Sequence, residues 1–290
     1  DQPRPQHAMG QMHIRTGRAR QNGYNSPRRD LDGGGAGETL AIEDVASFLF
    51  PSDLLQGQRR IIQVVHNEAC RQLRDVFKKS LPARSERVRQ IPSSLLSALG
   101  TQFKSIEIYR HSRLQWLPMD PPVLLVPASW NLEEIHESQW QFLLGGHLFL
   151  HRIGLSIPLA LNAEQMVHFL AALVQNVFPD RHFDNMDAQL VQEYSKYASK
   201  IVGRKDRDLL AGTILEMGSF DHKELSGIQD ALLRSADRAG YVCAGGFAPV
   251  MQSLDLLENG NARALKLLQF VASQLHVQLR EAALVARMRV

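Results

Sequence analysis

Apolar side chains recur every three to four residues along most of the chain after residue 40, which is the spacing of amphipathic α-helices. Pro51 is expected to end the first helix and Pro82 to follow the second. A break is expected at Ile91-Pro92, because the residue before a proline avoids the helical conformation. The predicted helices span residues 38–50, 53–80, 84–100, 131–154, 162–178, 186–203, 208–218, 221–244 and 261–288.

Two helix details can be specified further. Asn162 is a good N-cap for the helix that follows it. The final long helix carries an apolar face that we expect to pack on the domain. The residues on that face are Leu265, Leu268, Val271, Leu275 and Leu279.

Two segments in the middle of the chain have the patterns of β-strands. Residues 103–116 alternate and are rich in β-formers, which predicts one strand or a hairpin. Residues 122–130 are almost continuously apolar, which is typical of a short strand buried on both faces. The chain is therefore expected to have a predominantly helical α+β fold, with a small β-sheet packed beside a central helix.

The N-terminal residues 1–40 differ in composition from the rest. They are rich in glycine and glutamine and carry six arginines against four acidic residues. Such a segment buries too little apolar surface to offset the entropy of ordering. We expect a flexible basic arm, which is more simply a linker or expression remnant than a docking arm for an acidic partner. Residues 41–290 are expected to form one domain.

The helix expected at 131–154 contains two histidines, His147 and His151, four residues apart. That spacing puts both imidazoles on one face of the helix, one turn apart. It is the geometry of H-E-x-x-H zinc helices, in which the glutamate is the general base. Here the sequence is H-L-F-L-H, with Leu148 at the position of the glutamate.

A buried strand is followed by this helix and later by the segment L-R-S-A-D-R at 233–238. This order of elements resembles that of the gluzincin metallopeptidases of the HtpX and CAAX-prenyl-protease type. The resemblance covers about residues 103–257. In that family an E-x-x-A-D motif supplies the third zinc ligand, and the resemblance puts Leu233 at the ligand position. It leaves His147, His151 and the supporting Asp237 as the matching residues.

Leucine can neither bind zinc nor accept a proton, so we predict that the chain is not an enzyme of this kind. The two histidines are then expected to be packed residues of the fold, with no catalytic residue, cofactor or metal. The alternative is a metal-binding protein or unconventional hydrolase that holds zinc with His147 and His151, completed by Asp237. Three further histidines could complete such a ligand set, namely His136, His168 and His182.

Two other groups of residues resemble ligand sets. His66 and Cys70 lie four residues apart, and we expect a packed histidine and a small buried cysteine there. Three aspartates near residue 182 could bind a hard cation, but they lack the spacing of a calcium loop, and a solvated capping loop is the preferred interpretation. They are Asp180, Asp184 and Asp187.

Composition limits the function classes. The net charge is +3, which is too small to indicate nucleic-acid binding. Two cysteines far apart give no disulfide framework, which suggests an intracellular, most simply cytoplasmic, protein. The sequence contains no apolar run long enough for a membrane span. It begins at Asp1, so an upstream targeting segment stays open.

The function expected from these observations is a non-catalytic interaction or scaffold subunit that binds a protein partner or belongs to a larger complex. A plain helical adaptor unrelated to peptidases is a further alternative. A structure without a sheet beside the His147 helix, or with Asp237 far from that helix, would favour the adaptor.

Overall fold

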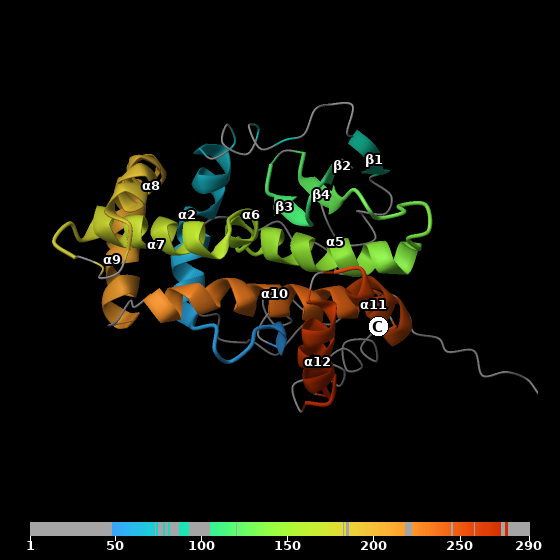
Figure 1. Ribbon diagram of the computed structural model, residues 1–290. Helices are drawn as coiled ribbons and strands as arrows, with labels where there is room; N and C mark the ends of the chain where they lie inside the picture. Colours follow the sequence, from blue (N-terminus) through green and yellow to red (C-terminus); the bar gives the residue numbers. More distant parts are fainter. Residues whose placement is uncertain are drawn as a thin grey trace, which may run out of the picture.

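The computed structural model has a predominantly helical α+β fold, as the sequence predicts (Figure 1). It describes residues 48–72, 74, 78, 81, 87–92, 105–119, 121–181, 183, 186–217, 222–244, 246–257, 259–273 and 276–277. Its helices in this part are α2 (Gln56–Gln72), α5 (Glu137–Arg152), α6 (Ile157–Ala160), α7 (Ala163–Val177), α8 (Ala188–Ile201), α9 (Arg204–Met217), α10 (His222–Ala244), α11 (Phe247–Asp255) and α12 (Gly260–Val271). The arm at 1–40 and most of the helix expected at 38–50 lie outside these residues.

The sheet has the strand order β1-β2-β4-β3, with β2 and β4 parallel and the other two pairs antiparallel. Its strands are β1 (Arg87–Pro92), β2 (Ser105–His111), β3 (Gln115–Leu117) and β4 (Val123–Pro127). The apolar strand β4 is buried and lies between two neighbours, which confirms the prediction for this segment. The hairpin alternative for 103–116 is wrong, because β2 and β3 each pair with β4 and not with each other.

The helix predicted over 84–100 is also wrong within the described residues. Residues 87–92 form strand β1, which pairs antiparallel with β2. Strand pairing between distant segments overrides a weak local preference. Pro92 ends the strand, a position where a proline is tolerated.

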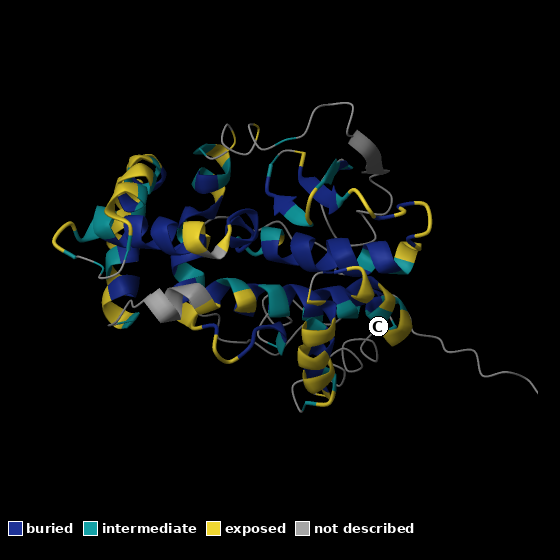
Figure 2. Cartoon of the chain, viewed as in Figure 1, coloured by how far each residue is buried: buried dark blue, intermediate teal, exposed yellow. Residues whose placement is uncertain are grey.

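Helix α5 is the centre of the molecule, with the sheet on one side and α10 on the other (Figure 1). Figure 2 shows that α5 is buried along most of its length. Small residues let the two helices approach closely. A Cβ atom added to Gly146 would lie 2.2 Å from the carbonyl oxygen of Ala236, and one added to Gly240 would lie 2.5 Å from that of Phe142.

Helices α7 and α8 follow the predicted pattern. The Asn162 side chain accepts a hydrogen bond from the backbone N–H of Gln165, as expected of an N-cap. Asp187 caps α8 in the same way. Helix α9 begins at Arg204, four residues before the predicted start, because the exposed mixed-charge stretch forms its first turn. No helix of the described residues is long and apolar enough to cross a membrane.

The C-terminal prediction fails in two respects. Helix α12 ends at Val271 and does not continue to 288. Its buried side chains are Ala264, Leu267 and Phe270, whereas Leu265 and Leu268 are 59% and 42% exposed. Val271 of the expected face is half-buried against the core, and Leu275 and Leu279 lie outside the described part.

Candidate functional site

At the start of the histidine helix α5, the backbone N–H of His136 donates to the Gln139 side-chain oxygen at 2.8 Å. Ten residues later the helix carries His147 on the side of the domain core. The His147 Nδ1–H donates to the carbonyl oxygen of Leu143 at 2.7 Å. Burial lowers the His147 pKa to about 4, so the ring is neutral near pH 7.

The second histidine, His151, belongs to a buried network that joins three helical segments. Its Nδ1 lies 2.9 Å from Ser156 Oγ, and the same oxygen lies 3.0 Å from His66 Nε2. A hydroxyl has one hydrogen, so Ser156 donates to one imidazole and accepts from the other. Asn67 Oδ1, 3.4 Å from His66 Nδ1, favours a proton on that nitrogen, which makes His66 Nε2 the acceptor.

Burial also determines the protonation of this network. It lowers the pKa of both His66 and His151 to about 4. Cys70 Sγ lies 3.7 Å from His66 Nε2, and burial raises the pKa of this thiol to about 12. Neutral imidazoles and a protonated thiol agree with the expectation that His66 and Cys70 are packed residues. Ser156 is fully buried and therefore out of reach of a substrate.

Trp116 of strand β3 fills the space beside both histidines. Its ring centroid lies 5.5 Å from that of His147 and 6.3 Å from that of His151. The indole is buried, and its N–H has no hydrogen-bond acceptor among the described residues. An N–H donor cannot coordinate a cation, so this side of the histidine pair offers no metal ligand.

The two leucines that the gluzincin resemblance puts at its acidic positions pack in or against the core. Leu148 is buried, and Leu233 of α10 is half-buried against the same core. Neither leaves a polar group near the histidines.

Asp237 is committed to another partner. Its carboxylate accepts two hydrogen bonds from the Arg263 guanidinium of α12, at 3.0 and 2.5 Å. Burial raises the pKa of Asp237, and the Arg263 charge opposes that shift. No three His, Cys, Asp or Glu side chains are arranged to hold a metal ion in the described part of the chain. The residues present therefore do not fit a zinc site.

The other sequence candidates have structural contacts as well. His168 Nδ1–H donates to the Glu164 carbonyl at 2.7 Å, and its Nε2 accepts from the Asp187 backbone N–H at 3.2 Å. Asp180 is exposed at the end of α7. His182 and Asp184 lie outside the described residues.

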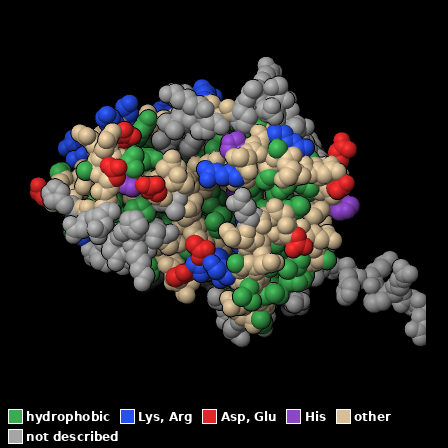
Figure 3. All heavy atoms as spheres, in the orientation of Figure 1, with side chains coloured by type: hydrophobic (Ala, Val, Ile, Leu, Met, Phe, Trp, Pro, Cys, Tyr) green, Lys and Arg blue, Asp and Glu red, His purple; other side chains and the backbone are tan. Residues whose placement is uncertain are grey.

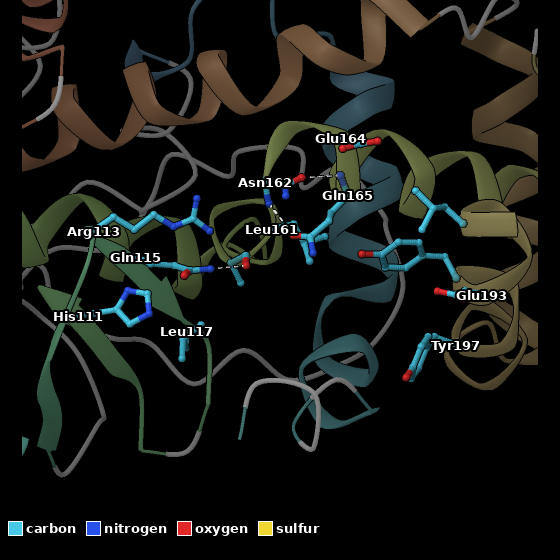
Figure 4. Close-up of a pocket in the computed structure, with 13 residues that line it drawn as sticks. His111, Arg113, Gln115, Leu117, Leu161, Asn162, Glu164, Gln165, Glu193 and Tyr197 are labelled. Carbon is cyan, nitrogen blue, oxygen red and sulfur yellow. Dashed lines mark hydrogen bonds between the residues drawn. The ribbon is translucent and has the colours of Figure 1, made fainter. Parts of the chain in front are cut away.

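A groove that the sequence did not suggest lies between β3 and the α7–α8 pair (Figure 4). Its volume is about 640 Å³. Gln115 and Leu117 of β3 line it, whereas Trp116 contacts the histidines, as alternation along a strand requires. Its charged lining residues, such as Arg113 and Glu193, are not buried. Several distant segments form the groove, so no local sequence pattern could have predicted it.

Comparison with known proteins identifies no relative. No family model matches the chain, and no curated protein or solved structure is similar to it. The functional argument therefore depends on the residues themselves.

Proposed function

We propose that this chain is a non-catalytic, metallopeptidase-like domain that acts as a protein-interaction or scaffold subunit. The observation that carries this proposal is the enclosure of the histidine helix. His147 bonds to the backbone of its own helix, His151 bonds to buried Ser156, and Leu148 lies in the core. Both imidazoles therefore have hydrogen-bonding roles that need no metal.

The arrangement of elements supports the metallopeptidase-like part of the proposal. A buried strand precedes the histidine helix, and strand β3 of the same sheet contacts His147 and His151 through Trp116. Helix α10 packs closely on α5, with Ala236 against Gly146 and Asp237 next in sequence. The sheet beside the His147 helix and the approach of Ala236 to Gly146 are the two features whose absence would favour a plain adaptor, although fold likeness alone does not give function.

The chemistry supports the non-catalytic part. A catalytic zinc needs three protein ligands and an open position for water, together with a base that takes a proton from that water. Here Leu148 and Leu233 occupy the base and ligand positions, and Asp237 is paired with Arg263. A buried site without a base or water access cannot activate water for hydrolysis.

Elemental analysis of the purified protein tests this proposal against the zinc alternative. The protein is incubated with zinc, dialysed and compared with the double variant His147→Gln/His151→Gln. We expect far less than one zinc per chain in both proteins and no cleavage of an unfolded protein substrate such as casein. A stoichiometry of about one zinc that the double variant loses would overturn the proposal.

A matched control uses the exposed histidine at the start of the same helix. His136→Asn removes an imidazole but keeps a good N-cap residue. Zinc that is lost equally from this control and from the double variant would be bound to surface histidines. Zinc lost only from the double variant, together with cleavage activity, would identify a metal-dependent hydrolase.

A further inference from the structure

The groove between β3 and the α7–α8 pair has charged residues of opposite sign on its two sides (Figure 4). Arg113 and His111 line the side where β2 ends and the chain continues toward β3. Glu164 of α7 and Glu193 of α8 line the other side. Arg113 and both glutamates are exposed, so a ligand in the groove can reach their charged groups.

The surface between these two sides is largely apolar. Leu117 of β3 and Leu161, which precedes α7, are buried side chains that line the groove. Helix α8 adds Tyr194 and Tyr197, which lie three residues apart and therefore share one face of the helix. Both tyrosines are half-buried. The groove thus combines an apolar floor, an aromatic wall and charges of both signs. In Figure 3, charged side chains of both signs lie on the surface of the molecule.

The two carboxylates act on the same tyrosine. Burial raises the pKa of the Tyr194 hydroxyl to about 12, and the negative charges of Glu193 and Glu164 add to that rise. Negative charge from two different helices therefore lies close to one aromatic ring. Among the residues that the structure describes, no lysine or arginine forms an ion pair with either glutamate, and no carboxylate pairs with Arg113. All three charges are available to a ligand.

The α8 side of the groove has the chemistry that recognises an arginine side chain. A guanidinium ion stacks on aromatic rings, donates hydrogen bonds to carboxylates and is more weakly hydrated than an ammonium ion. Tyr197, Glu164 and Glu193 offer these partners together. The apolar floor suits the hydrocarbon part of the arginine side chain. On the opposite side, the exposed Arg113 attracts a carboxylate.

We propose that the groove binds a segment of a partner protein that carries an arginine and an acidic residue. The guanidinium lies between Glu164 and Glu193, and the acidic side chain lies at Arg113. A peptide segment is favoured over a single small cation, because the two charge signs lie on opposite sides of the groove and one chain can meet both. This inference rests on the proposed interaction role and deepens it by giving the chemistry of the partner.

Selection from a random peptide library displayed on phage, with the full chain immobilised, tests the inference. The enriched peptides are synthesised with a fluorescent label, and their Kd values are measured by fluorescence anisotropy. We expect the tightest binders to share an arginine and an acidic residue. Replacing that arginine by alanine should raise the Kd by at least about tenfold, and replacing it by lysine should raise the Kd less.

Variants of the protein locate the binding site. Glu164→Gln/Glu193→Gln should raise the Kd about tenfold, because it removes both negative charges beside the guanidinium. The matched control is Glu133→Gln/Glu134→Gln, which changes the net charge equally at two exposed carboxylates that do not line the groove. This control should bind the peptides as the wild type does.

A further variant separates stacking from general attraction between a basic peptide and the protein. Tyr197→Leu leaves the charge unchanged and should raise the Kd about two- to fivefold, since it removes a ring that stacks on the guanidinium. Thermal unfolding followed by circular dichroism shows that each variant is folded.

Four results would overturn the inference. The first is that no peptide is enriched, and the second is that the enriched peptides bind the glutamate double variant, or bind without their arginine, as tightly as before. The third is that N-acetylarginine amide binds as tightly as the whole peptide, which would identify a small-cation site. The fourth is that a peptide of residues 1–30 displaces every enriched peptide, which would identify the chain's own N-terminal segment as the occupant.

The outcomes separate this inference from the proposed function. A protein that binds arginine peptides in the groove but also binds zinc and cleaves casein would overturn the non-catalytic role and leave the groove standing. A zinc-free, inactive protein that binds no such peptide would overturn the groove inference alone.

Discussion

Mild acid should destabilise this protein through its three buried histidines. His66, His147 and His151 have pKa values of about 4 in the folded state, against 6.5 for an exposed histidine. Because the folded-state pKa is lowered, the unfolded state binds more protons below pH 6.5. The stability from the neutral histidines is therefore complete above pH 6.5 and is lost as the pH falls toward 4.

The size of the effect follows from these pKa values. At pH 5.5 about 90% of unfolded histidines carry a proton, whereas the buried ones stay mostly neutral. Each buried histidine then costs about 1.4 kcal/mol relative to pH 7.5, so three cost about 4 kcal/mol. That is a large share of the 5–15 kcal/mol, roughly, that stabilises an ordinary domain. Exposed carboxylates contribute little in this range, since their ordinary pKa values are near 4. Asp237, whose pKa is raised by burial, acts in the opposite direction, so about 4 kcal/mol is the upper end of the expected loss.

Urea unfolding followed by circular dichroism, at pH 7.5, 6.5 and 5.5, measures the loss. His147→Gln should reduce it by about one third, because one of the three buried titrating groups is removed. His136→Asn, which removes an exposed histidine at the N-cap of α5, should leave it unchanged. A total loss under about 1 kcal/mol, or equal losses in the two variants, would refute the enclosure of the histidines.

Three further predictions concern the packing around α5, and urea unfolding at pH 7.5 measures each of them. Gly146→Ala forces a Cβ against the backbone of α10 and should lower the free energy of unfolding by about 1–3 kcal/mol. In its control, Gly212→Ala on α9, the new Cβ points into open space, so the free energy of unfolding should stay the same or rise by up to about 1 kcal/mol. Asp237→Asn leaves the partly buried Arg263 without its counter-charge and should lower the free energy of unfolding by about 3–5 kcal/mol. Asp230→Asn removes an exposed ion pair and should lower it by at most about 1 kcal/mol. Leu148→Glu should destabilise the fold by several kcal/mol, on the order of the cost of burying an unpaired polar group, and should yield no zinc binding. Equal effects within either matched pair, or a zinc-binding Leu148→Glu protein, would contradict these arguments.

The helical part of the fold was predictable because its determinants are local. The apolar period and the N-cap at Asn162 located α7 to within one residue at each end. They also located the body and end of α5, which begins six residues after the predicted start. The sheet was less predictable, since its order depends on pairing between distant segments. Nothing local in residues 87–92 indicates that β2 would be their neighbour, or that β4 would separate β2 from β3.

The histidine site was predictable in position but not in its contacts. The spacing of His147 and His151 placed both on one face of α5, and both lie there together against Trp116. The bridge from His151 through Ser156 to His66 could not be inferred, because His66 and Ser156 are 90 residues apart and neither belongs to a motif. The environment of the imidazoles, and thus their pKa values, comes from tertiary packing alone.

The exposed side of α12 could not be predicted from the sequence. Hydrophobic spacing predicts an apolar face on this helix with Leu265 and Leu268 inside, whereas both are exposed. Helix α12 is apolar on two sides, so spacing alone cannot choose between them. Its observed rotation puts Ala264, Leu267 and Phe270 in the core, with Arg263 against Asp237 of another helix. The side of α12 that packs on the core therefore depends on α10, and the exposure of Leu265 and Leu268 follows from that packing.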